Sequence, residues 1–269
     1  MSQFCHQNKG RACCPQCGFS RSWAIRRGHR KCKQCRKEWS PEQRIKGFQA
    51  SLPEWKEITR IFLKDRTGVR VAEAAGVERR CVHRMLHHLR TLMTNDRVGP
   101  FTGIVEIDET FIGGQWRNKP WRIRRKGTKR GHGTSKQAIF GLLSRDTGRV
   151  IAFPIPNLRS ETLLAALRSN LSPDAQVYTD GWTGYAHVVD FFSHKKVDHF
   201  NGIYVRGTVH TNSIESFWGY LKRRLKITGG IRVERLPLFL GEEVWRFNQR
   251  KLTLDEKVEK LLTLLVANE

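Results

Sequence analysis

Two Cys-x-x-Cys pairs near the amino terminus constrain the fold of this chain more than any other feature. They are Cys14-Pro-Gln-Cys17 and Cys32-Lys-Gln-Cys35, and fourteen residues separate them. Four thiolates on two tight turns give the closed tetrahedral site that structural zinc prefers. A segment this short has too small a core to fold unaided. We therefore predict a zinc ribbon in residues 1–46 that binds one structural Zn2+ through these four cysteines.

The other cysteines leave one alternative open. Cys13 could replace Cys14 as a ligand, although only Cys14 gives the two-residue spacing, and Cys5 has no assigned role. Matched pairs in a reducing compartment indicate metal binding rather than disulfides. The chain has no apolar run of the roughly 18 to 20 residues that span a membrane, and residues 1–14 lack the apolar core of a secretory signal. We expect a soluble, cytoplasmic protein associated with the nucleoid and no membrane partner.

Positive charge is concentrated in two segments. The 269 residues include 49 Lys+Arg and 25 Asp+Glu, which gives a formal charge of +24. Residues 1–37 and residues 111–145 each contain ten Lys or Arg and no acid, so together they carry +20. A solvated basic face usually contains interspersed acids, so this distribution favours contact with nucleic-acid phosphates. A ribosomal or RNA-binding protein would satisfy the charge alone equally well.

Residues 47–98 have the pattern of a helix-turn-helix. Ser51-Leu-Pro-Glu54 resembles a capping box, a short helix would hold Val71 and Ala72, and a turn follows at Gly76. The next helix has an apolar side with Val82, Met85, Leu86 and Leu89, and a basic side with Arg90 expected to be exposed. The candidates for DNA contact on that side are Arg79, Arg80 and Arg84. A plain helical bundle with a basic face is the alternative.

Acidic residues interrupt the strands predicted beyond residue 99. Residues 104–112 read as a strand in which alternation puts Glu106 and Asp108 on one face and Glu109 on the other. A carboxylate on a central strand is costly unless a cation or hydrogen bonds satisfy it. The strand at residues 175–180 ends at Asp180, a position where α/β folds place functional groups, although Asp before Gly is also a common turn residue.

Glu215 lies on a predicted helix, where two interpretations compete. Asn212 as N-cap with Glu215 three residues later would be a purely structural capping box. Helical geometry, however, aligns Glu215 with Gly219, Lys222 and Lys226 on a stripe beside the apolar face. A glutamate followed two turns later by Lys222 suits a metal bound next to a nucleic-acid phosphate.

The order of these elements is that of a ribonuclease-H-like α/β fold, a mixed sheet with flanking helices. Its three acids, on the first strand, the fourth strand and the last helix, would repel one another unless two divalent cations lay between them. Two such ions can activate a water or a 3′-hydroxyl and stabilise the leaving oxygen of a phosphodiester. We predict that Asp108, Asp180 and Glu215 bind two Mg2+ (or Mn2+). The catalytic domain would cover residues 99–233, and helices in residues 234–269 would complete it or form a dimer contact.

Three motifs together carry a family resemblance. Val105-Glu-Ile-Asp-Glu-Thr-Phe-Ile-Gly-Gly114, Val177-Tyr-Thr-Asp-Gly181 and Val209-His-Thr-Asn-Ser-Ile-Glu-Ser-Phe-Trp-Gly-Tyr-Leu-Lys222 follow a zinc ribbon. This combination resembles the ISXO-like insertion-sequence transposases of the DDE class over nearly the whole chain. The resemblance implies that Asp108, Asp180 and Glu215 are the catalytic triad and that Lys222 is the lysine following the glutamate. It also matches His210, to which we assign the orientation of a water or phosphate.

The basic insert at residues 115–136 lies between the first two strands of the catalytic domain. Charge and two tryptophans, Trp116 and Trp121, would let it grip the DNA backbone and stack on unpaired bases, although it could equally be disordered until DNA arrives. The further DNA-contact candidates are Arg122, Arg124, Arg125, Lys126, Lys129, Arg130 and, on the last helix of the domain, Arg223.

These features together predict a DNA transposase. It would bind the ends of an insertion element and target DNA, both double-stranded, as a dimer or higher oligomer, and catalyse phosphodiester hydrolysis and strand transfer. Two alternatives remain open: a non-enzymatic DNA-binding regulator derived from a transposase, and a ribonuclease-H-like nuclease without joining activity.

Overall fold

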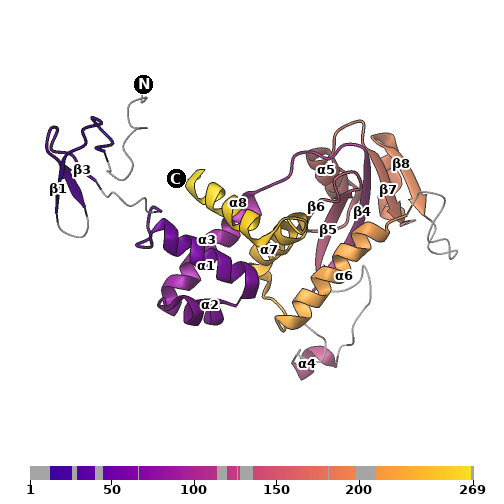
Figure 1. Ribbon diagram of the computed structural model, residues 1–269. Helices are drawn as coiled ribbons and strands as arrows, with labels where there is room; N and C mark the ends of the chain where they lie inside the picture. Colours follow the sequence, from indigo (N-terminus) through magenta and orange to yellow (C-terminus); the bar gives the residue numbers. More distant parts are fainter. Residues whose placement is uncertain are drawn as a thin grey trace.

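The amino-terminal segment of the computed structural model forms a small antiparallel sheet of three strands (Figure 1). The strands are β1 (Ser22–Ala24), β2 (Arg30–Cys32) and β3 (Glu38–Trp39), in the order β1-β2-β3.

The structure describes residues 13–25, 29–39, 45–65, 67–113, 120–125, 127, 136–180, 182–197 and 210–267. Both Cys-x-x-Cys pairs lie within these ranges, and Cys5 lies outside them.

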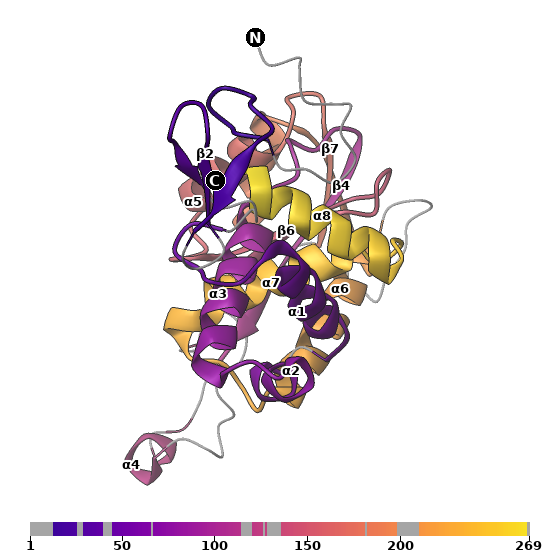
Figure 2. The ribbon, with the colours of Figure 1, turned by 60° about the vertical axis from the view of Figure 1, so that its left-hand side comes forward.

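A helical module follows, built from α1 (Leu52–Asp65), α2 (Gly68–Ala75) and α3 (Arg79–Asn95). The predicted capping box forms at α1, where the Ser51 backbone N–H donates to Glu54 Oε2 at 2.7 Å. Gly76, at φ 62°, ends α2 in the left-handed conformation that glycine adopts at low cost. The last helix of the chain, α8 (Leu254–Ala267), packs against α1 and α3, as the views in Figures 1 and 2 both show. Its Val258, Leu261 and Leu265 share the apolar core of this module.

A mixed sheet of five strands forms the larger part of the chain. Its strands are β4 (Ile104–Ile112), β5 (Gln137–Ser144), β6 (Val150–Ile155), β7 (Gln176–Asp180) and β8 (Ser193–Val197), in the order β6-β5-β4-β7-β8. β4, β5 and β6 pair antiparallel, whereas β7 and β8 run parallel to β4. This is the predicted ribonuclease-H-like arrangement, with the first strand at the centre.

Helices cover both faces of the sheet (Figure 1). α5 (Ser160–Asn170) and the 3-10 helix η4 (Thr183–Asp190) pack on the face that contains Val105 and Ile107. α6 (Asn212–Ile227) and α7 (Leu236–Asn248) pack on the opposite face, where Ile139 and Leu143 meet Phe217. The remaining short helices are α4 (Trp121–Arg124), between β4 and β5, and η6 (Val233–Arg235).

α7 belongs to two cores at once. Its Leu236, Phe239 and Leu240 pack with α6 against the sheet, whereas Trp245 packs in the core of the helical module. Residues 234–269 therefore do not act as one unit. α7 joins the five-stranded sheet to the helical module, and α8 packs in the core of that module. No helix among the described residues is long and apolar enough to cross a membrane.

Candidate active site and zinc site

Asp108 and Asp180 lie side by side because of the register between two parallel strands. β4 pairs with β7 through Val105 and Val177 and through Glu106 and Tyr178. The pairing ends two residues before Asp108 and Asp180, which lie at corresponding positions further along the two strands and interact electrostatically. Asp180 ends β7, and its Oδ1 also accepts the backbone N–H of Trp182 at 3.2 Å, so the turn role considered for it is present too.

Glu215 approaches the same place from α6. Burial is the largest cause that raises the pKa of the Asp108 carboxyl, and with the negative charges of Asp180 and Glu215 acting in the same direction the pKa reaches about 7. Asp108 therefore lies close enough to Asp180 and to Glu215 to be repelled by both. Their oxygens are less tightly gathered than metal ligands, because the four cysteines are the one group in the described ranges with three or more ligand atoms within 4.8 Å of one another.

Hydrogen bonds orient the Asp108 side chain between α6 and its own strand. The indole Nε1 of Trp218 donates to Asp108 Oδ2 at 2.9 Å, and the backbone N–H of Glu109 donates to Oδ1 at 2.8 Å. Trp218 reaches the strand because Gly141, the residue of β5 opposite Asp108, has no side chain. A Cβ atom on Gly141 would lie 2.5 Å from Trp218 Cζ2.

Glu106 caps the amino-terminal turn of α6. Its Oε2 accepts the backbone N–H groups of Ser213 at 2.9 Å and Ile214 at 3.0 Å, and its side chain is 0% exposed. Oε1 accepts a hydrogen bond from Arg145 Nε at 2.6 Å, so the buried charge is paired. Free backbone N–H groups and a positive dipole favour a carboxylate at a helix start. Glu106 therefore pins α6 to β4.

This arrangement decides between the two interpretations of Glu215. The N-cap of α6 is Thr211 rather than Asn212, and no side-chain cap bond reaches a backbone N–H from it. Glu215 accepts only a hydroxyl contact from Thr211, at 3.3 Å. Because Glu106 satisfies the amides of the first turn, Glu215 is not the capping-box glutamate and its exposed carboxylate is available for another role.

The other two predicted catalytic residues are His210, which precedes Glu215 in the sequence, and Lys222, which follows it. The His210 carbonyl accepts Arg145 Nη2 at 2.6 Å, and the ring Nδ1 lies 3.4 Å from Glu106 Oε1 without an aligned hydrogen bond. Lys222 is exposed on α6, two turns after Glu215. The structure thus gathers Asp108, Asp180 and Glu215, holds His210 against Glu106, and leaves Lys222 on the surface of the helix.

A buried pair, Glu109 and Tyr185, was not singled out from the sequence. The Tyr185 hydroxyl, on η4, donates a hydrogen bond to Glu109 Oε2 on β4. Burial raises the pKa of the Glu109 carboxyl to about 8, and Asp108 and Asp180 act in the same direction. The sequence signal that could have revealed this pair is the alternation along β4, because it places Glu109 on the apolar face of the strand. The pair ties the segment after Asp180 to the strand that carries Asp108.

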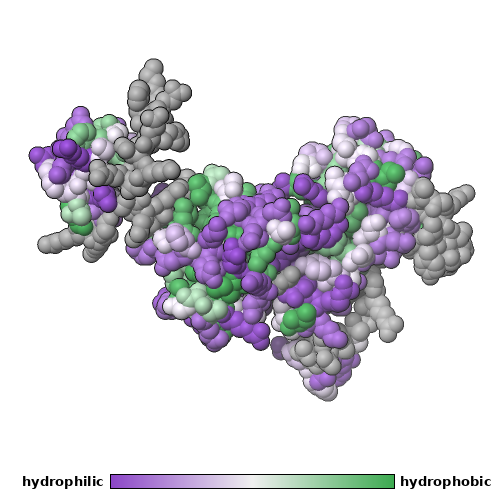
Figure 3. Space-filling view, in the orientation of Figure 1, coloured by the Kyte–Doolittle hydropathy of each residue, from purple (hydrophilic) through white to green (hydrophobic). Residues whose placement is uncertain are grey.

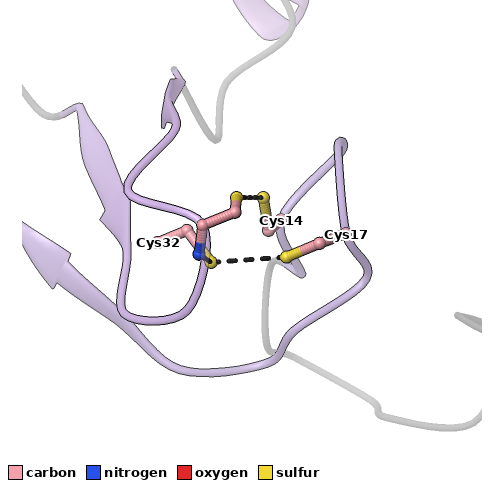
Figure 4. Close-up of side chains that lie close together, drawn as sticks. Cys14, Cys17 and Cys32 are labelled. Atoms are coloured by element: carbon pink, nitrogen blue, oxygen red, sulfur yellow. Dashed lines mark hydrogen bonds between the residues drawn. The ribbon is translucent and has the colours of Figure 1, made fainter.

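The four predicted zinc ligands come together in the ribbon (Figure 4). Cys14 Sγ and Cys35 Sγ lie 3.5 Å apart, as do Cys17 Sγ and Cys32 Sγ, and all four sulfurs lie within 4.8 Å of one another. A zinc–sulfur bond of about 2.3 Å in a tetrahedron places sulfurs roughly 3.8 Å apart. The donor set therefore fits zinc, and the cluster contains Cys14 rather than Cys13.

The predicted DNA-contact residues differ in exposure. Arg79, Arg80 and Arg84 are exposed on α3, and Arg84 also donates to the Gly47 carbonyl at 3.1 Å. Arg90, expected to be exposed, is instead half-buried and pairs with Glu242 at 2.7 Å, because α7 covers that side of α3. Among the predicted contacts in the insert and on α6, Arg122, Arg124, Arg125 and Arg223 are exposed, whereas Lys126, Lys129 and Arg130 lie outside the described residues.

The central mixed sheet with helices on both faces defines a protein of the ribonuclease-H-like fold class. The sequence profile of the ISXO2-like transposase domain matches residues 100–248. The chain therefore belongs to the ISXO2-like family of insertion-sequence transposases of the DDE class.

Individual relatives agree with this assignment. An uncharacterized protein in transposable element ISH50 of Halobacterium salinarum is 30% identical over 223 residues, 78% of this chain and 74% of the relative. An uncharacterized transposase-like protein of Haemophilus influenzae is 34% identical over 115 residues, 42% of this chain and 93% of the relative. Among solved structures, the catalytic core domain of BIV integrase is similar with a TM-score of 0.33 and 13% identity, covering 56% of this chain and 85% of that one.

Proposed function

We propose that this chain is an active DNA transposase whose ribonuclease-H-like domain cuts and joins phosphodiesters at Asp108, Asp180 and Glu215. The observation that carries the proposal is the repulsion of the Asp108 carboxyl by Asp180 and by Glu215, which lie on two other elements. Carboxylates placed this close together are costly, and hard divalent cations would relieve that cost. Two Mg2+ or Mn2+ ions, when bound, would supply Lewis acidity and an activated oxygen nucleophile.

The roles of the protein residues follow from their positions. Asp108, held by Trp218, and Asp180 and Glu215 would bind and orient the ions through their oxygens. Lys222, on the same stripe of α6 as Glu215, would hold a phosphate of the DNA. His210 would orient a water or a phosphate through Nε2, since its Nδ1 faces Glu106.

The amino-terminal segments would recognise the DNA ends. We propose one structural Zn2+ in the Cys14, Cys17, Cys32 and Cys35 cluster, and a helix-turn-helix in which α3 presents Arg79, Arg80 and Arg84 to the major groove. The insert, with Trp121 at 65% exposure, would contact the DNA backbone beside the cut. A dimer or higher oligomer would assemble on the double-stranded ends.

The test is a cleavage and joining assay with the full chain. The substrate is duplex DNA carrying the ends of the encoding element, with Mg2+ and a target plasmid. We expect cleavage and joined products, and a loss of both by more than about 100-fold in Glu215→Gln, because even outer-shell changes at metal sites cost about 10- to 100-fold. Glu234→Gln, an exposed glutamate in η6, is the matched control.

The other outcomes separate the alternatives. If Glu215→Gln cuts and joins as well as the parent, the assignment of the triad is wrong. Binding without metal-dependent cleavage would indicate a DNA-binding regulator instead. Cleavage without joined products would indicate a nuclease that lacks strand transfer.

A further inference from the structure

A hollow lined by cations lies between α6, α7 and α8. Its volume is about 430 Å³, and no Asp or Glu is among its lining residues. Hydrophilic side chains cover most of the face of the molecule on which α6 lies (Figure 3). The polar and charged residues that line the hollow are Ser216, Tyr220, Arg223, Arg246, Arg250 and Lys257.

The positive charge of this hollow is largely uncompensated. Arg246 is 8% exposed and pairs with Glu242 at 2.9 Å, so its charge is balanced within the fold. Arg250 donates to the carbonyls of Gly148 and Phe247, which are neutral. Across the described residues, no carboxylate oxygen lies within 4.0 Å of Arg223, Arg250 or Lys257. Three cations thus line a concave surface without an ion pair to an acid, and Glu256 interacts with Lys257 only at longer range.

The hollow lies next to the stripe of α6 that carries Glu215. Ser216, the next residue, lines it, and Arg223 Nη1 lies 3.5 Å from the position that a Cβ on Gly219 would occupy. Arg223 therefore extends back along the helix toward the carboxylates. Arg223 lies eight residues after Glu215, which places their Cα atoms about 12 Å apart along the axis. At about 3.4 Å of rise per nucleotide, this spans roughly three to four nucleotides of one strand.

We propose that the hollow binds a backbone phosphate of the DNA, about three to four nucleotides from the bond held at the carboxylates. Guanidinium groups match phosphate oxygens in geometry, and a site with uncompensated cations favours a polyanion. The hollow is lined by α6 of the catalytic sheet and by α8 of the helical module, so one phosphate there would fix the register between recognition and cleavage. This inference rests on the proposed function.

The experiment measures DNA binding by the full chain over a range of salt concentrations, without divalent cations. Arg223→Gln with Lys257→Gln removes one exposed and one half-buried cation, and Arg168→Gln, on α5 at the opposite face of the sheet, is the control. Each lost phosphate contact lowers the slope of log affinity against log salt by about 0.9. We expect a slope reduced by one to two in the double variant, no change in the control, and retention of the slope in Arg223→Lys.

A methylphosphonate scan locates the phosphate. Neutralising single phosphates three to four nucleotides from the cut should weaken the parent but not the double variant. Equal losses in both proteins, or an unchanged salt slope, would overturn the hollow as a phosphate site. If the parent cuts DNA while the hollow variants bind normally, the hollow is not a phosphate site and the proposed transposase function is retained. If binding depends on the hollow but the parent does not cut DNA, the hollow is a phosphate site and the proposed transposase function is wrong. An absence of binding by the parent overturns both.

Discussion

The carboxylate of Glu106, at the centre of the sheet, accepts the backbone N–H of Ile214 at 3.0 Å across 108 residues of sequence. This bond joins the strand of Asp108 to the first turn of the helix of Glu215. The relative position of the two proposed metal ligands therefore depends on a third acid that lies two residues from one of them. Arg145 balances its charge from the turn that follows β5.

Replacing Glu106 should loosen this connection. Glu106→Gln leaves the guanidinium of Arg145, 16% exposed, without its carboxylate. Because breaking a buried ion pair costs about 3 to 5 kcal/mol and Arg145 is partly solvated, we expect a loss of roughly 2 to 4 kcal/mol in the free energy of unfolding. Urea denaturation measures it, with Glu234→Gln as the control expected within about 0.5 kcal/mol of the parent. A loss no larger than that of the control would contradict the capping role.

Asp108→Asn should stabilise the metal-free protein at high pH. Because the pKa of Asp108 is raised to about 7 in the fold, the unfolded chain ionises first as the pH rises. The parent therefore loses stability between about pH 4 and pH 7, whereas the asparagine variant does not lose this contribution. We expect the variant to be more stable than the parent by roughly 1 to 3 kcal/mol at pH 8 and by less at pH 5. Adding Mg2+ should narrow the gap at pH 8, because cations favour the parent's carboxylates. A gap that is the same at both pH values would count against the raised pKa.

Glu242 gives the opposite pH dependence. Burial disfavours its charged form, but Arg246 and Arg90 outweigh burial and hold the pKa of Glu242 below its usual range. Its contribution is fully present above the unfolded pKa, about 4.3, and is lost as the pH falls through the lower folded value. Glu242→Gln should therefore lower stability at pH 7 by roughly 3 to 5 kcal/mol and flatten the fall in stability below about pH 4. Denaturation curves at pH 3, 4, 5 and 7 for both proteins check this, and parallel curves would refute it.

Zinc removal should affect the ribbon selectively. The strands of the ribbon are short, and the ribbon gathers four thiols. We therefore expect the purified chain to contain one equivalent of zinc. We also expect the ribbon to unfold when a chelator removes the zinc. Cys17→Ser should lose most of the zinc, whereas Cys13→Ser should keep it, since Cys13 lies outside the cluster. Elemental analysis and the NMR signal of the Trp23 indole report the two effects. Zinc loss in Cys13→Ser equal to that in Cys17→Ser would point to Cys13 as a ligand.

Gly141 should tolerate no side chain. In Gly141→Ala, the new Cβ would meet the ring of Trp218 at 2.5 Å, so α6 or β5 must shift. Overpacking of this kind costs about 1 to 3 kcal/mol. Because Trp218 donates to Asp108, we also expect cleavage activity to fall more than stability alone explains, measured at a temperature where both proteins are folded. Gly99→Ala, where a Cβ would meet nothing within 4 Å, is the control. If Gly141→Ala were as active as Gly99→Ala, the hydrogen bond from Trp218 would not be needed for cleavage.

Local pattern was sufficient to place the acids on β4, β7 and α6, but it did not locate β8. Alternation along β4 and the ends of β7 and α6 follow from residue type and spacing, so Asp108, Asp180 and Glu215 could be placed on their elements. The partners of these residues could not be predicted. Glu106 meets Ile214, and Arg90 meets Glu242, through contacts between segments more than a hundred residues apart. A three-residue spacing suggested a capping box for Glu215, whereas a distant carboxylate took over the capping.

The position of α8 has a consequence for the order in which the protein is made. The helical module contains the first long helix of the chain and also its last, so the apolar surfaces of Trp55, Met85 and Leu89 await Val258 and Leu261. During synthesis, α1 to α3 leave the ribosome well before the helix that closes their core. The helical module is therefore completed only after the five-stranded sheet has been translated. A ribosome that stops early releases a protein whose helical module lacks part of its core.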